Sequence, residues 1–189
     1  MAKIGLRNFM FGQLVETESQ GTVTYSYGKG YKPAKAINCS VSITSNNAVL
    51  RADDGVAESD TSFQSGTVSI GLDDDNLEMQ ARMLGHTISS GVITRKVDDM
   101  APYLGLARIV TKVVGGVYKY KVEFLSKVQF SEPAQEDNTR AESIEFGTIT
   151  MEGQVMTRGD GEWSKAEEFT SMSDAQTYME SLFGSTPTL

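Results

Sequence analysis

Alternation of apolar and polar residues over 117–130 constrains the fold of this chain more than any other feature. One side of this segment carries Tyr118, Tyr120, Val122, Phe124, Val128 and Phe130, and the other carries Lys119, Lys121, Glu123, Lys127 and Gln129. Only Leu125 and Ser126 break the pattern. Because successive side chains of a strand point to opposite faces, the segment predicts a strand with one buried and one solvent-exposed face. This pattern is typical of antiparallel sheets stacked face to face.

Further segments extend the same pattern into a mainly β fold. Gly115-Gly116 can supply the positive φ angles of a tight turn, which predicts a long hairpin between 103–114 and 117–130. Shorter alternating strands are expected at 37–44, at 66–73 and at 143–157. In the last of these, Ile144 and Phe146 share one side and Ile149, Met151 and Val155 the other, so a bulge is expected near Gly147.

Two short helices are expected beside the strands. Asp73 and Asp74 precede a helix at 75–84, which they can cap, and its predicted packing side carries Leu77, Ala81 and Leu84. Gly85 suits the position just after this helix. A second helix is expected at 174–183, with Ser173 and Gln176 forming a capping box. Its apolar stripe comprises Ala175, Tyr178, Met179, Leu182 and Phe183.

Length and charge restrict the class of protein. A chain of 189 residues fits one large domain or two very small ones. We expect one β-sandwich domain at 1–157 with an N-terminal arm, followed by a C-terminal segment at 158–189 whose helix packs on the domain or extends from it. The formal net charge of −8 disfavours a duplex-binding protein, which needs clustered cations. The N-terminal residues lack the apolar core of a secretion signal, and no apolar run approaches the roughly 20 residues of a membrane helix. We therefore expect no membrane association.

The residue types needed for catalysis or metal binding are scarce. His86 is the only histidine and follows a predicted helix end, where a surface or capping role is the commoner one. Cys39, the only cysteine, lies on the apolar side of 37–44 and is expected to be a buried structural thiol. The run Asp73-Asp74-Asp75 is not a calcium loop, because Leu77 stands where the fifth position needs an oxygen ligand. No catalytic site, cofactor or metal is expected, and the chain is not predicted to be an enzyme.

Several segments, in their order along the chain, resemble a known family. They are MAKIGLRNF at the start, NAVLRADDGVAESDTSFQSGTVSIGLDDDNLEMQARMLGH at 47–86, then VDDMAPYLGLARI and KVEFLSKVQFSEPAQEDNTRAESIEFGTITMEGQVM. Together these segments resemble the major tail tube proteins of long-tailed bacteriophages of Gram-positive hosts. The resemblance covers most of residues 1–157 and fades after Trp163.

The resemblance implies a structural virion protein that is made and assembled in the host bacterial cytoplasm. Its fold would be a β-sandwich flanked by the helix at 75–84, and its assembly would be hexameric rings stacked into the tail tube. The implied partners are further copies of the chain, the tail tip or baseplate, the tape measure protein and the tail terminator. DNA would pass through the lumen without specific binding.

The acidic segment within 46–65 admits two interpretations. It is either a solvated hairpin tip or, as the resemblance implies, a loop that docks on the next ring. The candidate residues for inter-ring contact are Arg51, Asp53, Asp54, Glu58 and Asp60. Exposed ion pairs across such a joint would each contribute only about 0–1 kcal/mol.

The small polar sides of two predicted strands are candidates for lining the lumen. They carry Asn38, Ser40 and Ser42 on one strand, and Thr67, Ser69 and Asp73 on the other. These residues are uncharged or acidic, so they suit a channel for DNA better than the lysines of 117–130, since each cation that contacts phosphate adds affinity.

The alternative hypothesis is a monomeric β-sandwich module that recognises a peptide or glycan. Trp163 is the residue that such a module could use for stacking, although anchoring the C-terminal segment is the commoner role for a single tryptophan. A monomer at high protein concentration would favour the module, and rings or tubes would favour the tube protein. A hydrolase is disfavoured because no nucleophile–base pair stands out.

Overall fold

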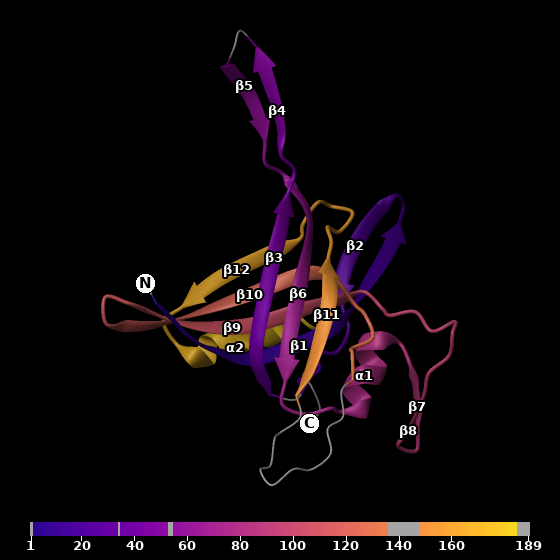
Figure 1. The fold of residues 1–189 in the computed structure, drawn as a ribbon. Helices are drawn as coiled ribbons and strands as arrows, with labels where there is room; N and C mark the ends of the chain where they lie inside the picture. Colours follow the sequence, from indigo (N-terminus) through magenta and orange to yellow (C-terminus); the bar gives the residue numbers. More distant parts are fainter. Residues whose placement is uncertain (1, 34, 53–54, 136–147, 185–189) are drawn as a thin grey trace.

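The chain folds into a mainly β structure with antiparallel strands and two short helices, consistent with the predicted β-sandwich (Figure 1). The computed structural model describes residues 2–33, 35–52, 55–135 and 148–184. In chain order the elements are β1 (Ala2–Ser19), β2 (Thr22–Tyr27), β3 (Ala36–Ser45), β4 (Ala48–Ala52), β5 (Gly55–Asp60), β6 (Phe63–Leu72), α1 (Leu77–Leu84), β7 (Thr87–Ser89), β8 (Val92–Thr94), β9 (Leu104–Val114), β10 (Val117–Phe130), β11 (Ile149–Val155), β12 (Ser164–Phe169) and α2 (Met172–Ser181).

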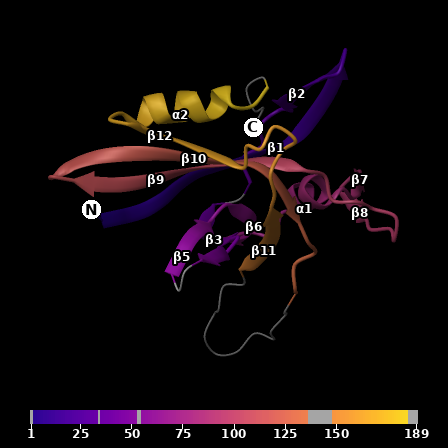
Figure 2. The same cartoon turned by 90° about the horizontal axis from the view of Figure 1, so that it is seen from above.

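One eight-stranded sheet folds on itself, so that it forms both layers of the sandwich. Its order is β2-β1-β9-β10-β11-β6-β3, and β12 also pairs with β10. Strand β10 is shared between the layers, because its residues 120–125 pair with β12 and its residues 128–130 pair with β11. In Figure 2, β3, β6 and β11 lie on one side of β9 and β10, and α2 lies on the other.

Two apolar clusters follow from this layering. The inner core lies between the layers and includes Phe11, Ile70, Leu106, Val128 and Met151. The outer core lies under α2 and includes Met10, Ile109, Val122, Phe124 and Met179. Burying each of these large side chains contributes about 1.5–3 kcal/mol relative to leaving it exposed.

The predicted long hairpin is confirmed, but its apolar residues do not share one face. Gly115 and Gly116 have φ angles of 58° and 81°, as the tight turn between β9 and β10 requires. The β9–β10 register shifts between Leu125 and Val128, where β10 carries one extra residue. Phe124 therefore belongs to the outer core, whereas Val128 belongs to the inner core. Leu125 and Ser126, the two exceptions to the alternation, mark this bulge.

Helix α1 is close to its predicted position, but its cap and packing side differ from the prediction. Its N-cap is Asn76, whose side-chain Oδ1 accepts hydrogen bonds from the backbone N–H groups of Glu78 and Met79, so Asp73 and Asp74 do not cap it. Gly85 has a φ of 78° and ends the helix as predicted. The prediction that Leu77 packs on the sandwich is wrong, because its side chain is 42% exposed, while Ala81 and Leu84 are buried. The methionines at 79 and 83 enter the inner core in place of Leu77.

Helix α2 begins two residues before the predicted start. Its N-cap is Ser171, which makes no side-chain capping hydrogen bond, so the predicted capping box of Ser173 and Gln176 is wrong. The predicted apolar stripe is confirmed, since Ala175, Met179 and Phe183 are buried in the outer core and Tyr178 and Leu182 pack against it. This stripe places α2 against β9 and β10.

The two ends of the predicted domain also differ from expectation. Residues 2–19 form strand β1, which pairs with β9 on one side and β2 on the other, rather than a separate N-terminal arm. Long pairing with β9 explains this, because an extended segment gains a full ladder of backbone hydrogen bonds in the sheet. The strand predicted at 143–157 is β11 at 149–155, where Ile149, Met151 and Val155 are buried as expected. Ile144, Phe146 and Gly147 lie outside the described residues.

Candidate functional site

An exposed polar face covers the outer side of β3, β6 and β11. The β3–β6 register places Ser40 opposite Ser69 and Ser42 opposite Thr67, and the β6–β11 register places Glu152 on the other side of Ser69. We call this surface the polar face; its members are Asn38, Ser40, Ser42, Thr67, Ser69, Thr150, Glu152 and Gln154. Asp73 is exposed and follows directly after β6. The predicted candidates on 37–44 and 66–73 therefore lie together on one surface.

Sequence reasoning missed the contribution of β11 to this surface. Thr150, Glu152 and Gln154 alternate with the buried Ile149, Met151 and Val155, so the alternation itself marked them as an outward side. What the sequence could not supply was the pairing of β11 with β6, a partner almost eighty residues earlier in the chain. The pairing widens the polar face from two strands to three.

The polar face carries little charge. Glu152 is its only ionisable member, and no Lys or Arg belongs to it. Lys121 of β10 lies elsewhere, with its Nζ 2.7 Å from Glu123 Oε1, beside a cavity of about 240 Å³ that is also lined by Val41 and Ile43. Lys121 therefore faces the inner side of β3, not the polar face.

A hairpin of two short strands, β4 and β5, projects from the ends of β3 and β6 (Figure 1). This segment was expected to be either a solvated hairpin tip or a docking loop, and it forms a paired ribbon that extends away from the sandwich. Arg51 lies on β4 and Glu58 on β5, while Asp53 and Asp54 lie outside the described residues.

Asp60 closes the base of this hairpin. Its Oδ2 accepts a hydrogen bond from Asn46 Nδ2 at 2.8 Å, and its Oδ1 accepts one from the backbone N–H of Ser62 at 2.9 Å. The hydrogen bonds from Ser62, and then that from Asn46, lower the pKa of Asp60 from its ordinary value. Both carboxylate oxygens are thus engaged within the chain, so Asp60 sets the geometry of the hairpin base.

His86 joins the segment after α1 to the end of β10. Its Nδ1 lies 2.8 Å from Asp99 Oδ2, and its Nε2 meets Glu132 Oε1. The side chain is only 6% exposed, so the expectation of a surface histidine is wrong. The hydrogen bond from His86, followed by that from the backbone of Lys96, lowers the pKa of Asp99. These contacts hold the stretch between β8 and β9 against the body of the protein.

That stretch and the β7–β8 hairpin carry exposed apolar side chains. Val92 is 64% exposed, Val97 98% and Met100 81%. Isolated exposed apolar residues are common, but several on one projecting segment are typical of contact surfaces.

Cys39 and His86, the cysteine and the histidine of the chain, are each engaged with other side chains. Cys39 Sγ lies 2.8 Å from Arg108 Nη1. His86 contacts the carboxylates of Asp99 and Glu132. Burial raises the pKa of the Cys39 thiol despite the neighbouring guanidinium, so the reactive thiolate is disfavoured. Among the described residues, no group of three or more His, Cys, Asp or Glu side chains is placed to hold a metal ion.

Trp163 is half-buried and stacks on Phe63, with ring centroids 4.6 Å apart and an interplanar angle of 10°. Its backbone carbonyl accepts a hydrogen bond from the N–H of Ser126 at 2.9 Å. Trp163 thus anchors the segment before β12 to the sandwich near the base of the β4–β5 hairpin.

Comparison with known proteins leaves the family open. No protein-family model and no curated protein matches this chain. In the described residues, neither helix has the length and apolar content that crossing a membrane requires.

Proposed function

We propose that this protein is a tail tube subunit, which polymerises as stacked rings into a conduit for DNA. The observation that carries the proposal is the polar face, a continuous surface of three strands with one carboxylate and no cation. A polyanion moves freely past such a surface, because no Lys or Arg is present to release counterions from phosphate.

The outline of the molecule supports assembly. The β4–β5 hairpin extends beyond the sandwich, so it can reach a neighbouring copy without disturbing the core (Figure 1). Strand β3 ends one side of the sheet order, and its outer edge has no paired strand among the described residues. Joining such edges around a ring would pair their exposed backbone N–H and C=O groups, which otherwise promote aggregation. Closure of a barrel removes strand edges in the same way. The exposed Val92, Val97 and Met100 supply apolar area for a contact between copies.

Electron microscopy of the purified protein tests the proposal. Negatively stained samples should contain rings or hollow tubes at high protein concentration. A variant that lacks residues 48–60, with Asn47 joined to Thr61 through a short Gly-Asn turn, should fold but form no tubes, since loops tolerate such exchanges. A variant with Gly115-Gly116 replaced by Asn-Gly is the matched control and should form normal tubes. Circular dichroism would establish that both variants are folded.

One result would contradict the proposal, and a second would contradict only the role assigned to the hairpin. Protein that stays monomeric at every concentration would favour the alternative, a binding module. Normal tubes from the folded hairpin deletion would remove the assembly role of β4 and β5 while leaving the tube itself intact.

A further inference from the structure

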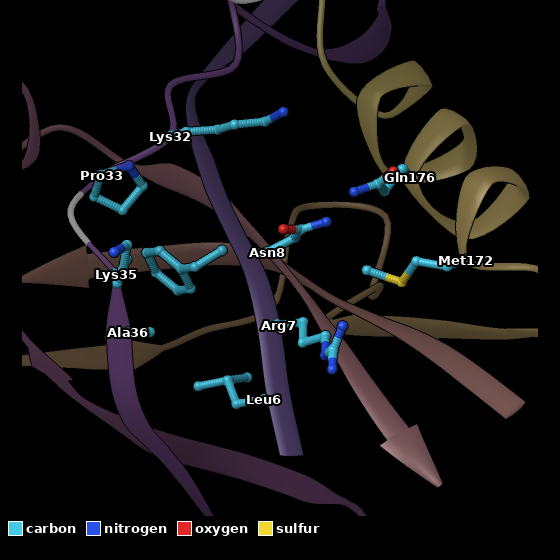
Figure 3. A pocket seen from close by; sticks show the side chains of 10 residues that line it. Leu6, Arg7, Asn8, Lys32, Pro33, Lys35, Ala36, Met172 and Gln176 are labelled. Carbon is cyan, nitrogen blue, oxygen red and sulfur yellow. The ribbon is translucent and has the colours of Figure 1, made fainter. Parts of the chain in front are cut away.

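A groove crosses β1 between the start of β3 and the start of α2. It has a volume of about 570 Å³, and its polar lining comprises Arg7, Asn8, Lys32, Lys35 and Gln176. In Figure 3, Lys32 reaches over β1 towards α2, and Gln176 points its amide nitrogen towards Asn8. The sequence by itself did not indicate this groove, because its members come from three separated segments.

Asn8 is held in an unfavourable state at the centre of the groove. Its φ angle is 45°, at a shift in the β1–β9 register between Arg7 and Phe9. Its side-chain Nδ2 is buried and has no hydrogen-bond partner in the described part of the chain. A buried donor without an acceptor is costly, because it has given up its hydrogen bonds to water. An acceptor that a docked molecule brought to Asn8 would remove this cost.

The charge of the groove identifies that acceptor as acidic. Lys32 is neutralised by Glu180, with 3.0 Å between Nζ and Oε1. Arg7 and Lys35 are both exposed, and no ion pair joins either to another described residue. Two free cations next to an unsatisfied amide N–H fit a carboxylate, which accepts several hydrogen bonds at once.

The molecule carries an acidic element at the opposite end of β3. Lys35 directly precedes β3, and the β4–β5 hairpin follows its other end, so about ten residues, or roughly 33 Å of strand, separate the two. Figure 1 shows the hairpin pointing away from the end where β3 begins. The sequence of 48–60 contains Asp53, Asp54 and Glu58 against a single Arg51, apart from the engaged Asp60.

We propose that the β4–β5 hairpin of a second copy docks in this groove and presents its carboxylates to Arg7, Asn8 and Lys35. A contact between opposite ends of the same molecule is head-to-tail, so it propagates as an open column. The inference rests on the proposed tube and identifies where one ring meets the next.

Charge exchange tests the pairing. Arg7→Glu/Lys35→Glu should prevent tube formation, and so should Asp53→Lys/Asp54→Lys, each raising the protein concentration needed for tubes by at least about tenfold, because like charges then meet at the joint. The variant with all four changes should form tubes again. A mixture of the two double variants should also form tubes, in which the copies alternate along each column. Lys119→Glu, which makes the same charge change per residue on β10, outside both the groove and the apolar contact surface, is the control and should leave assembly unchanged.

The outcomes separate this inference from the proposed function. Normal tubes from folded Arg7→Glu/Lys35→Glu protein would overturn the docking site while the tube protein stands. Failure of the four-change variant, with folding verified by its melting temperature, would overturn the pairing of hairpin and groove. Wild-type protein that remains monomeric throughout would overturn both.

Discussion

Replacing Met79 by alanine should destabilise the protein strongly, whereas Leu77→Ala, two positions earlier on the same helix, should not. Met79 is fully buried in the inner core, and Leu77 is 42% exposed. Both substitutions remove a few side-chain heavy atoms from α1. Both also introduce alanine, so the helix propensity of the new residue is the same in the two variants. Burial is therefore the main variable that separates them.

The expected cost follows from what Met79 loses. Three heavy atoms beyond Cβ leave the core, which removes about 2.4 kcal/mol at roughly 0.8 kcal/mol per buried group. The cavity left behind adds to this, and measured Met→Ala changes in cores fall at about 2–5 kcal/mol. Leu77→Ala should change the free energy of unfolding by about 0.5 kcal/mol or less, as exposed positions usually do.

Urea denaturation measures both values. Trp163 is the only tryptophan and stacks on Phe63, so its fluorescence reports the loss of tertiary structure. In a chain of this size, about 2–5 kcal/mol corresponds to a fall in melting temperature of roughly 4–20 °C. Equal destabilisation by the two substitutions would refute the orientation assigned to α1, and a loss below about 0.5 kcal/mol for Met79→Ala would show that this side of the helix is not packed in solution.

Three further predictions test other parts of the molecule. Ser69→Lys should leave folding and tube formation intact, but its tubes should retain added duplex DNA at low salt and release it at high salt; tubes that never retain DNA would argue against a lumen lined by the polar face. Glu123→Gln should cost about 3 kcal/mol at pH 7, because it leaves the guanidinium of Arg108 without its carboxylate partner. Burial raises the pKa of Glu123, but hydrogen bonds from Lys121 and Arg108 outweigh it and lower the pKa overall, so this stabilisation is present above the unfolded pKa of about 4.3 and is lost as pH falls through the folded value. A difference between variant and wild type that stayed constant down to acid pH would contradict this assignment. Gly85→Ala should cost more than about 1 kcal/mol in thermal unfolding, since φ is 78° and the added Cβ would meet the carbonyl oxygen of Met100; a neutral change would mean that the loop before β9 yields easily.

The period-two pattern predicted five of the twelve strands of the described residues, namely β3, β6, β9, β10 and β11. It predicted the β9–β10 hairpin with its Gly115-Gly116 turn, and it assigned Ser40 and Ser69 to outward sides of their strands before any pairing was known. This succeeded because alternation across a strand is a local property that depends only on backbone geometry. The apolar stripe of α2 was predictable for the same reason, from its helical period.

The arrangement of those elements depended on contacts between distant segments. The extra residue near Ser126 moves Val128 to the other core, and the pairing of β11 with β6 brings Glu152 beside Ser69. The groove around Asn8 combines β1, the start of β3 and α2, so no single stretch of sequence indicates it. The sequence by itself thus determined which side chains alternate within these strands and where the turn between β9 and β10 lies. Only the tertiary structure decided which surfaces meet, because register and layering are set by packing between segments far apart in the chain.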